Sequence, residues 1–171
     1  KIGGWTKVST AALTGVCRGL HSWSDLGAIL RAGMGTHLKY YLEEGGIYYD
    51  VTPIRLDATL GTDPFTTDTI GLGILTVVHT SHGAVEGDYV TYSGATTFDG
   101  ITTGNLNKEQ IITEVTDANT YKIDTGGVAT AGSVSGGGAA VDAEYQINIG
   151  QIDFAGEAGF GAGVWSGDQG W

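Results

Sequence analysis

The sequence predicts an all-β fold, and three observations support this expectation. Glycine makes up 30 of the 171 residues, and glycine is unfavourable inside helices but common in tight turns. Short runs of Val, Ile, Thr and Tyr recur between clusters of Gly, Asp, Asn and Ser, the pattern of strands separated by turns. Residues 38–51 alternate in polarity on both sides of a Gly-Gly pair. We therefore expect a β-meander plus a small β-sandwich or open-barrel domain.

The first segment, residues 1–55, is predicted to be a β-meander that forms part of a larger β body. Its apolar runs "GVCRGLHSW" and "GAILRAGMG" flank "SDLG", where a helix beginning at Ser24 is a weaker alternative because of its glycines. The hairpin that follows places one set of apolar side chains on a common face: Leu38, Tyr40, Leu42, Ile47, Tyr49 and Val51. A small sheet buries too little surface alone, so we expect other parts of the chain or a neighbouring subunit to cover this face.

The second segment, residues 74–149, is predicted to be an inserted β domain with five short strands. Residues 56–73 show no clear period and are expected to be a connector. The glycine-rich stretch 126–141 is expected to be a flexible loop or a sheet edge. The predicted core positions of the domain are Val77, Val90, Ile112, Val115, Tyr121, Ile123, Tyr145 and Ile147.

The C-terminal segment, residues 150–171, combines glycine with widely spaced aromatic residues. Alone it is too short and too rich in glycine to bury enough surface to fold. We expect it to pack against a neighbouring copy or the rest of a longer parent chain, of which this sequence is a piece. The predicted assembly contacts are Phe154, Phe160, Trp165 and Trp171.

The net charge of −11 is carried almost entirely by the residues after position 55, where Lys108 and Lys122 are the only cations. Such an acidic surface repels phosphate groups, so we expect no nucleic-acid partner. The chain also lacks a run of about 20 apolar residues, so we expect no membrane insertion.

Several motifs, in their order along the chain, resemble virion structural proteins of tailed bacteriophages. They are "RGLHSW", "GMGTHLKYYLEEGGIYYDVTPIR", "GDYVTYSGATTFDGI" and "FGAGVWSG". The hairpin resembles the propeller-like blades of tail or nozzle-type proteins, although "SDLGAIL" is shorter than the polar turn of that pattern. The stretch from "GDYVTYSG" to "NTYKI" is similar to immunoglobulin-like or FCCH-type β domains inserted in such proteins. The resemblance covers roughly residues 18–167 and implies a tail or tail-associated protein that contacts other copies of itself or other virion proteins.

Carboxylates are the first candidates for catalysis, and their spacing argues against it. Glu43 and Glu44 are adjacent, so in a strand they point to opposite faces and cannot flank one glycosidic bond. Asp50 precedes a strand end, where backbone groups can bind it. We therefore expect no enzymatic activity and no cofactor.

Metal sites are also disfavoured by the pattern. His79 and His82 are three residues apart at a strand end, a spacing that suits a helix, and Cys17 lies in an apolar run that indicates the core. Asp117, Asn119 and Asp124 in "DANTYKID" resemble the ligands of a calcium loop, but the required Gly and Glu do not follow. A turn explains these residues better.

A carbohydrate-binding module remains the alternative function. In the loop "ATTFDGITTGN", Phe98 offers a ring for a sugar to stack on, while Asp99 and Asn105 offer acceptors for hydroxyl groups. The partner would then be a host surface glycan. A glycan-degrading enzyme would need a carboxylate pair, which the sequence does not display.

Overall fold

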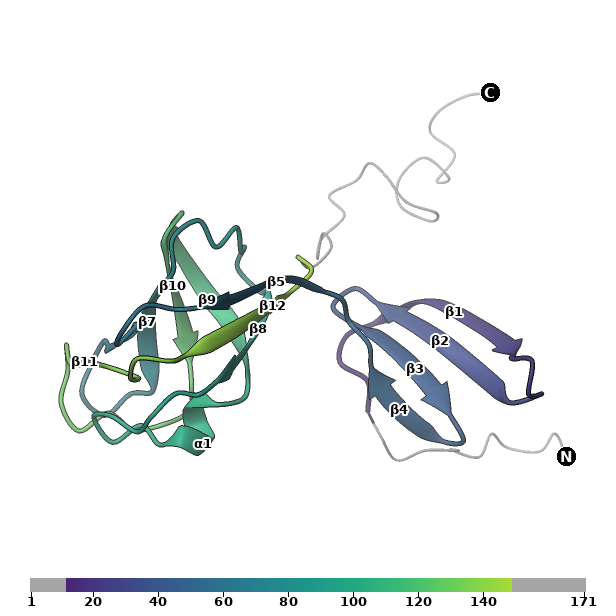
Figure 1. The fold of residues 1–171 in the computed structure, drawn as a ribbon, viewed down its shortest axis with the longest axis horizontal. Helices are drawn as coiled ribbons and strands as arrows, with labels where there is room; N and C mark the ends of the chain where they lie inside the picture. The colour runs from purple at the N-terminus through teal and green to yellow at the C-terminus, as the bar shows by residue number, and fades with distance from the viewer. Residues whose placement is uncertain (1–11, 149–171) are drawn as a thin grey trace, which may run out of the picture. The chain divides into compact units, whose positions relative to one another are not determined.

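The computed structural model describes residues 12–148, which form two compact units, residues 12–51 and residues 52–148 (Figure 1). Strands make up nearly all of the regular structure in the described part, where the single helix has four residues. The all-β fold class expected from the sequence is confirmed.

The first unit is an antiparallel meander of four strands in the order β1-β2-β3-β4 (Figure 1). The strands are β1 (Cys17–Ser24), β2 (Leu30–Thr36), β3 (Tyr40–Glu44) and β4 (Ile47–Asp50). Gly45 and Gly46 join β3 to β4 with φ angles of 61° and 88°, and a two-residue type I′ turn needs positive φ at both positions. The hairpin and the strand interpretation of the first segment are confirmed. Cys17, expected in the core, is exposed because β1 is an edge strand.

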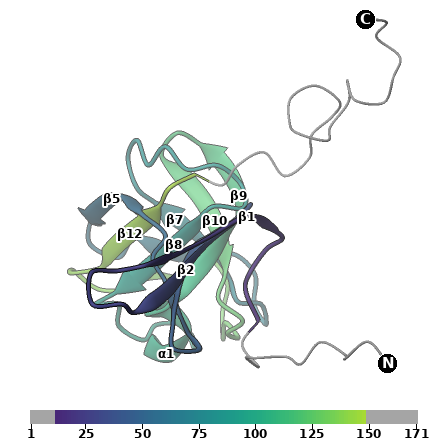
Figure 2. The same ribbon diagram turned by 90° about the vertical axis from the view of Figure 1, so that its right-hand side faces the viewer.

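The second unit is an eight-stranded sheet that curls into a half-barrel, as Figures 1 and 2 show from two sides. The strand order is β11-β6-β7-β10-β9-β8-β12-β5, and all neighbouring strands are antiparallel. The elements are β5 (Ile54–Thr59), β6 (Phe65–Thr67), β7 (Ile74–Val78), β8 (Tyr89–Ser93), α1 (Thr103–Leu106), β9 (Glu109–Asp117), β10 (Thr120–Asp124), β11 (Ser135–Gly136) and β12 (Asp142–Gln146).

The range 56–73, expected to be a connector, instead contributes strands to this sheet. β5 pairs with β12, and β6 pairs with both β7 and β11. β6 has three residues, which is too short to show a period, and β5 is an edge strand whose residues are mostly exposed or half-buried. The strand propensity of these two segments is weak, and they form strands because they pair with β7, β11 and β12.

The core of the second unit follows the predicted period-two pattern. Among the predicted core residues, those with no exposed surface are Val77, Val90, Ile112, Tyr121, Ile123 and Tyr145. Val115 and Ile147 are half-buried. The core also contains residues from segments that were expected to be loops, namely Phe65, Ile101, Leu106 and Val141.

The glycine-rich stretch 126–141 contains β11, the edge strand at one end of the sheet. Gly136 in β11 packs directly under the Phe98 ring, because a Cβ there would lie 2.3 Å from the Phe98 Cγ. A larger residue would displace the ring. This contact explains why the edge contains glycine at that position.

A chain of hydrogen bonds crosses the core of the second unit. The hydroxyl oxygens of Tyr92 and Tyr121 are 2.5 Å apart, those of Tyr121 and Tyr145 are 2.8 Å apart, and Tyr145 Oη lies 2.7 Å from His79 Nδ1. Burial raises the pKa of Tyr92 and Tyr121 well above the ordinary value and raises the pKa of Tyr145 to about 12. The three phenols therefore stay neutral and serve as hydrogen-bond donors and acceptors. The Arg55 guanidinium lies 5.3 Å from the centre of the Tyr145 ring, a cation–π contact.

His79 is expected to make the second unit less stable in acid. Burial lowers its pKa below 6.5, and the nearby His82 and Arg55 lower it further. The unfolded chain therefore binds the proton more readily, so stability is complete above pH 6.5 and declines as the pH falls through the lowered pKa. Urea unfolding monitored by near-UV circular dichroism at about pH 7.5 and pH 5.5 measures this loss. The decrease in the free energy of unfolding between these pH values should be smaller in His79→Gln and unchanged in His21→Gln. Equal decreases in both variants would show that His79 is not the group responsible.

Replacing Ile123 by Ala should reduce the free energy of unfolding by about 2–4 kcal/mol, because the side chain is fully buried and its removal leaves a cavity. Ile111 is the matched control, since it is 48% exposed on the neighbouring strand β9. Ile111→Ala should cost well under about 1 kcal/mol. Chemical denaturation of the full chain measures both variants. A loss below about 0.5 kcal/mol for Ile123→Ala would contradict the core described here.

Candidate interaction surface

The loop that was predicted to contact glycans is anchored inside the second unit. The Phe98 ring stacks on Phe65, with 6.3 Å between ring centres, and is half-buried. Asp99 accepts hydrogen bonds of 2.7 Å from the hydroxyls of Thr67 and Thr130, and from one backbone N–H. Although burial acts to raise the pKa of Asp99, the hydrogen bonds from Thr130 and Thr67 hold it below the ordinary value. Asp99 therefore closes a loop by joining β6 to the chain before β11.

Asn105 has a similar role at the short helix α1. Its side-chain oxygen accepts a 2.7 Å hydrogen bond from the Thr102 hydroxyl, and its amide donates to the carbonyl of Thr125. Phe98, Asp99 and Asn105 each have an internal partner in the second unit. Glycan binding by these three residues stays a prediction from the sequence.

His82 and Asp117, two of the residues considered as metal ligands, are engaged by backbone groups. His82 Nδ1 accepts from the Ala84 N–H, and its Nε2 lies 3.0 Å from the carbonyl oxygen of Asp117. Asp117 Oδ1 in turn accepts from the Asn119 N–H, which closes the β9–β10 turn. Between residues 12 and 148, no group of three or more His, Cys, Asp or Glu side chains is arranged to hold a metal ion.

The carboxylates of the first unit stabilise its meander. Glu43 accepts a 2.6 Å hydrogen bond from the backbone of the Gly-Gly turn, Glu44 pairs with Arg31, and Asp50 lies 2.7 Å from the Nζ of Lys39. Lys39 is only 3% exposed, so the ion pair neutralises a charge that would be costly to bury alone. Each of these acids has a structural partner within the meander.

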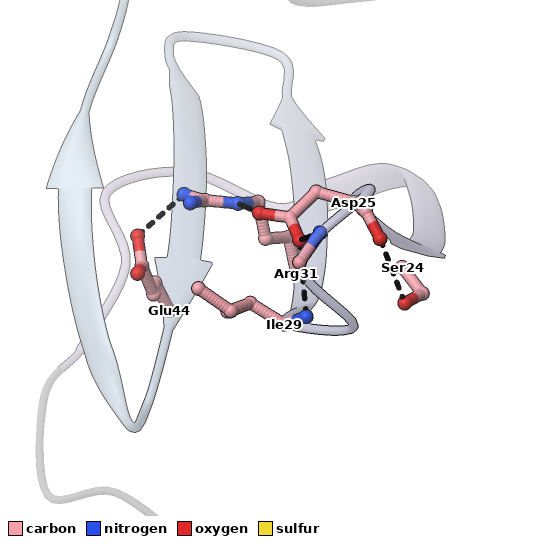
Figure 3. Close-up of polar contacts among 6 residues, drawn as sticks. Ser24, Asp25, Ile29, Arg31 and Glu44 are labelled. Carbon is pink, nitrogen blue, oxygen red and sulfur yellow. Dashed lines mark hydrogen bonds and ion pairs between the residues drawn. The ribbon is translucent and has the colours of Figure 1, made fainter.

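The turn between β1 and β2 is organised by Asp25 (Figure 3). Its Oδ1 accepts hydrogen bonds from the N–H groups of Gly27 and Ile29, at 2.8 and 3.0 Å, and its Oδ2 lies 3.2 Å from Arg31 Nε. The Ile29 N–H holds the pKa of Asp25 below its ordinary value, and the hydrogen bond to Asp25 raises the pKa of Arg31. Arg31 also contacts Glu44 on β3, so this cluster links the turn to the centre of the sheet.

The sheet of the first unit leaves large apolar side chains exposed on both faces. All eight residues of β1 are exposed. One face exposes Trp23, Tyr40, Ile47, Tyr49 and Val51, and the other exposes Leu20 and Leu30. A β-sheet normally buries at least one face against another layer, and exposed apolar patches of this kind mark interaction sites.

One face of the sheet is hollowed into a groove of about 850 Å³. Its floor consists of glycines that the strand register places on the same face: Gly19 on β1, and Gly33 and Gly35 on β2. The walls are formed by His21, Trp23, Tyr40, Leu42 and Val51, and Leu20, Met34 and Tyr41 also border the groove. A Cβ at Gly33 would lie 3.2 Å from the Trp23 ring, and a Cβ at Gly35 would lie 3.4 Å from the Tyr40 ring. We call this site the glycine-floored groove.

The glycine-floored groove was not predicted from the sequence. A signal for it was present, because "GMG" in β2 places two glycines on the same face of one strand. The third glycine is brought beside them by the pairing of Gly19 with Gly35. Recognising the site therefore requires the register between β1 and β2.

The fold and surface define an all-β protein with one filled β unit and one exposed meander. No family model matches the chain, and no curated protein matches it. Among solved structures, the chain is similar to phage phi92 endosialidase, with a TM-score of 0.43 and 17% sequence identity. The similarity covers 77% of this chain and 17% of the endosialidase chain, so the present chain spans a small part of that protein's length. The chain therefore has a distant structural neighbour among phage proteins.

Residues 1–55 taken alone are expected not to fold cooperatively. Their sheet exposes apolar side chains on both faces and has no second layer within residues 12–51, and a sheet of this size is marginal without one. Thermal unfolding of this fragment, followed by circular dichroism, should show no sigmoidal transition, whereas the full chain should show one. A soluble, monomeric and cooperatively folded fragment would contradict this.

Proposed function

We propose that this chain is a structural component of a phage tail or a tail-associated part of the virion. It acts in assembly and stability through subunit contacts, and its partners are other copies of itself or other virion proteins. It has no enzymatic activity and uses no cofactor. The observation that carries the proposal is the exposed four-stranded sheet of the first unit.

The energetics of this sheet support a role in assembly. Burying a large apolar side chain contributes about 1.5–3 kcal/mol. Two exposed leucines, Leu20 at 69% and Leu30 at 75%, lie on the sheet face opposite Trp23 and Tyr40 and are placed to gain this energy on contact with another subunit.

The second unit supports the same proposal in a different way. Its core is filled by buried apolar side chains and tyrosines from most of its strands. Its acidic surface resists non-specific association, because like charges on neighbouring molecules repel. Contact with other subunits is thus directed to the meander.

Two substitutions test the proposal in the full chain. Leu20→Lys and Leu30→Lys each place a charge on the sheet face opposite Trp23 and Tyr40, so the double variant should lose self-association in sedimentation velocity experiments over a range of concentrations. Val128→Lys is the matched control, since Val128 is 62% exposed but lies in the second unit. The control should associate like the unsubstituted chain. A monomeric unsubstituted chain, or equal association in all variants, would contradict self-assembly through this face.

A further inference from the structure

We propose that the C-terminal segment, residues 149–171, docks into the glycine-floored groove of its own chain. Its aromatic side chains, Phe154, Phe160, Trp165 and Trp171, would then pack over the open floor at Gly19 and against the apolar walls of the groove. These four residues lie outside the described part of the structure, which ends at Asn148. The inference goes beyond the proposed function, because it assigns one face of the sheet to the chain itself.

The residues before the segment are hydrogen-bonded to the chain that leads directly into the groove. Ile147, close to its start, donates a 2.9 Å backbone hydrogen bond to the carbonyl of Pro53. Pro53 is two residues after Val51, which lines the groove and donates a 2.9 Å backbone hydrogen bond to Tyr40 in its wall. These two hydrogen bonds and the chain between them keep the start of the segment within a few residues of the groove.

The segment is also long enough to cross the sheet. Neighbouring strands are about 4.8 Å apart, and an extended chain advances about 3.3 Å per residue. Residues 149–171 therefore reach several times farther than the distance from β4 to β1. A path across all four strands uses only part of this length.

The chemistry of the segment matches that of the groove. Glycine in a strand leaves a hole above the backbone, and an aromatic ring placed over it recovers apolar burial. At Gly19, an added Cβ would meet no atom within 4 Å, so the floor is open there. The segment supplies four aromatic rings separated mostly by glycine and alanine, and it contains no lysine or arginine. Each docked ring buries about 150–250 Å².

The single cysteine allows a direct test in the full chain. Cys17 is exposed on β1, two residues before Gly19, and it is the only cysteine in the sequence. A bimane fluorophore attached to Cys17 is quenched by tryptophan at contact distance. If the segment docks, the labelled chain should be quenched at all protein concentrations. The double variant Trp165→Phe and Trp171→Phe should lose this quenching, whereas Trp5→Phe in the N-terminal segment should retain it.

A second pair of variants tests the groove itself. Gly19→Val fills the open floor without a clash and should also relieve the quenching, whereas Ser22→Val on the opposite face of β1 should not. Circular dichroism shows whether both variants retain the sheet. Equal fluorescence of the unsubstituted chain and the double tryptophan variant would overturn the proposal. Loss of quenching in Trp5→Phe would assign the groove to the N-terminal segment. Quenching that rises with protein concentration would assign the groove to a neighbouring copy. Either result would also overturn the proposal.

Discussion

Strand β5 pairs along its length with β12, and this pairing brings the first and last residues of the second unit side by side. The backbone hydrogen bond between Ile147 and Pro53 continues the contact beyond the strands. Antiparallel pairing of two segments almost ninety positions apart requires closing a long loop, a cost that only the packed core between them repays. The two ends of the second unit consequently lie close together.

The two units differ in how far they bury their apolar side chains. The curled sheet of the second unit encloses its apolar residues, and its buried tyrosines satisfy one another's hydroxyl groups across the core. The sheet of the first unit has no such layer within residues 12–51, and its stability there comes from the turns, the ion pairs of Lys39 and Arg31, and the strand ladder. A protein with this division is suited to making contacts through one unit while the other stays intact. In the described part of the chain, none of the helices is long and apolar enough to cross a membrane.

The polar residues that could serve as ligands form hydrogen bonds within the structure. Asp99 holds a loop against β6, Asp25 organises a turn, and His82 is bonded through both ring nitrogens. Short polar side chains in loops often bind nearby backbone groups. The candidate interaction site is instead the groove above Gly19, Gly33 and Gly35, residues that have no side-chain functional group.

The sequence by itself determined the fold class, the Gly45–Gly46 hairpin, the five main strands of the second unit and most of its core. These features depend on local rules, because positive φ at a turn and alternation along a strand are properties of neighbouring residues. Only the tertiary structure decided that residues 56–73 contain β5 and β6, that Asp99 and Asn105 have internal partners, and that Cys17 is exposed. The glycine-floored groove also exists only in the tertiary structure, because the register of β1 against β2 places Gly19 beside Gly35. Register and edge pairing arise from contacts between distant segments, and no local pattern in either segment specifies them.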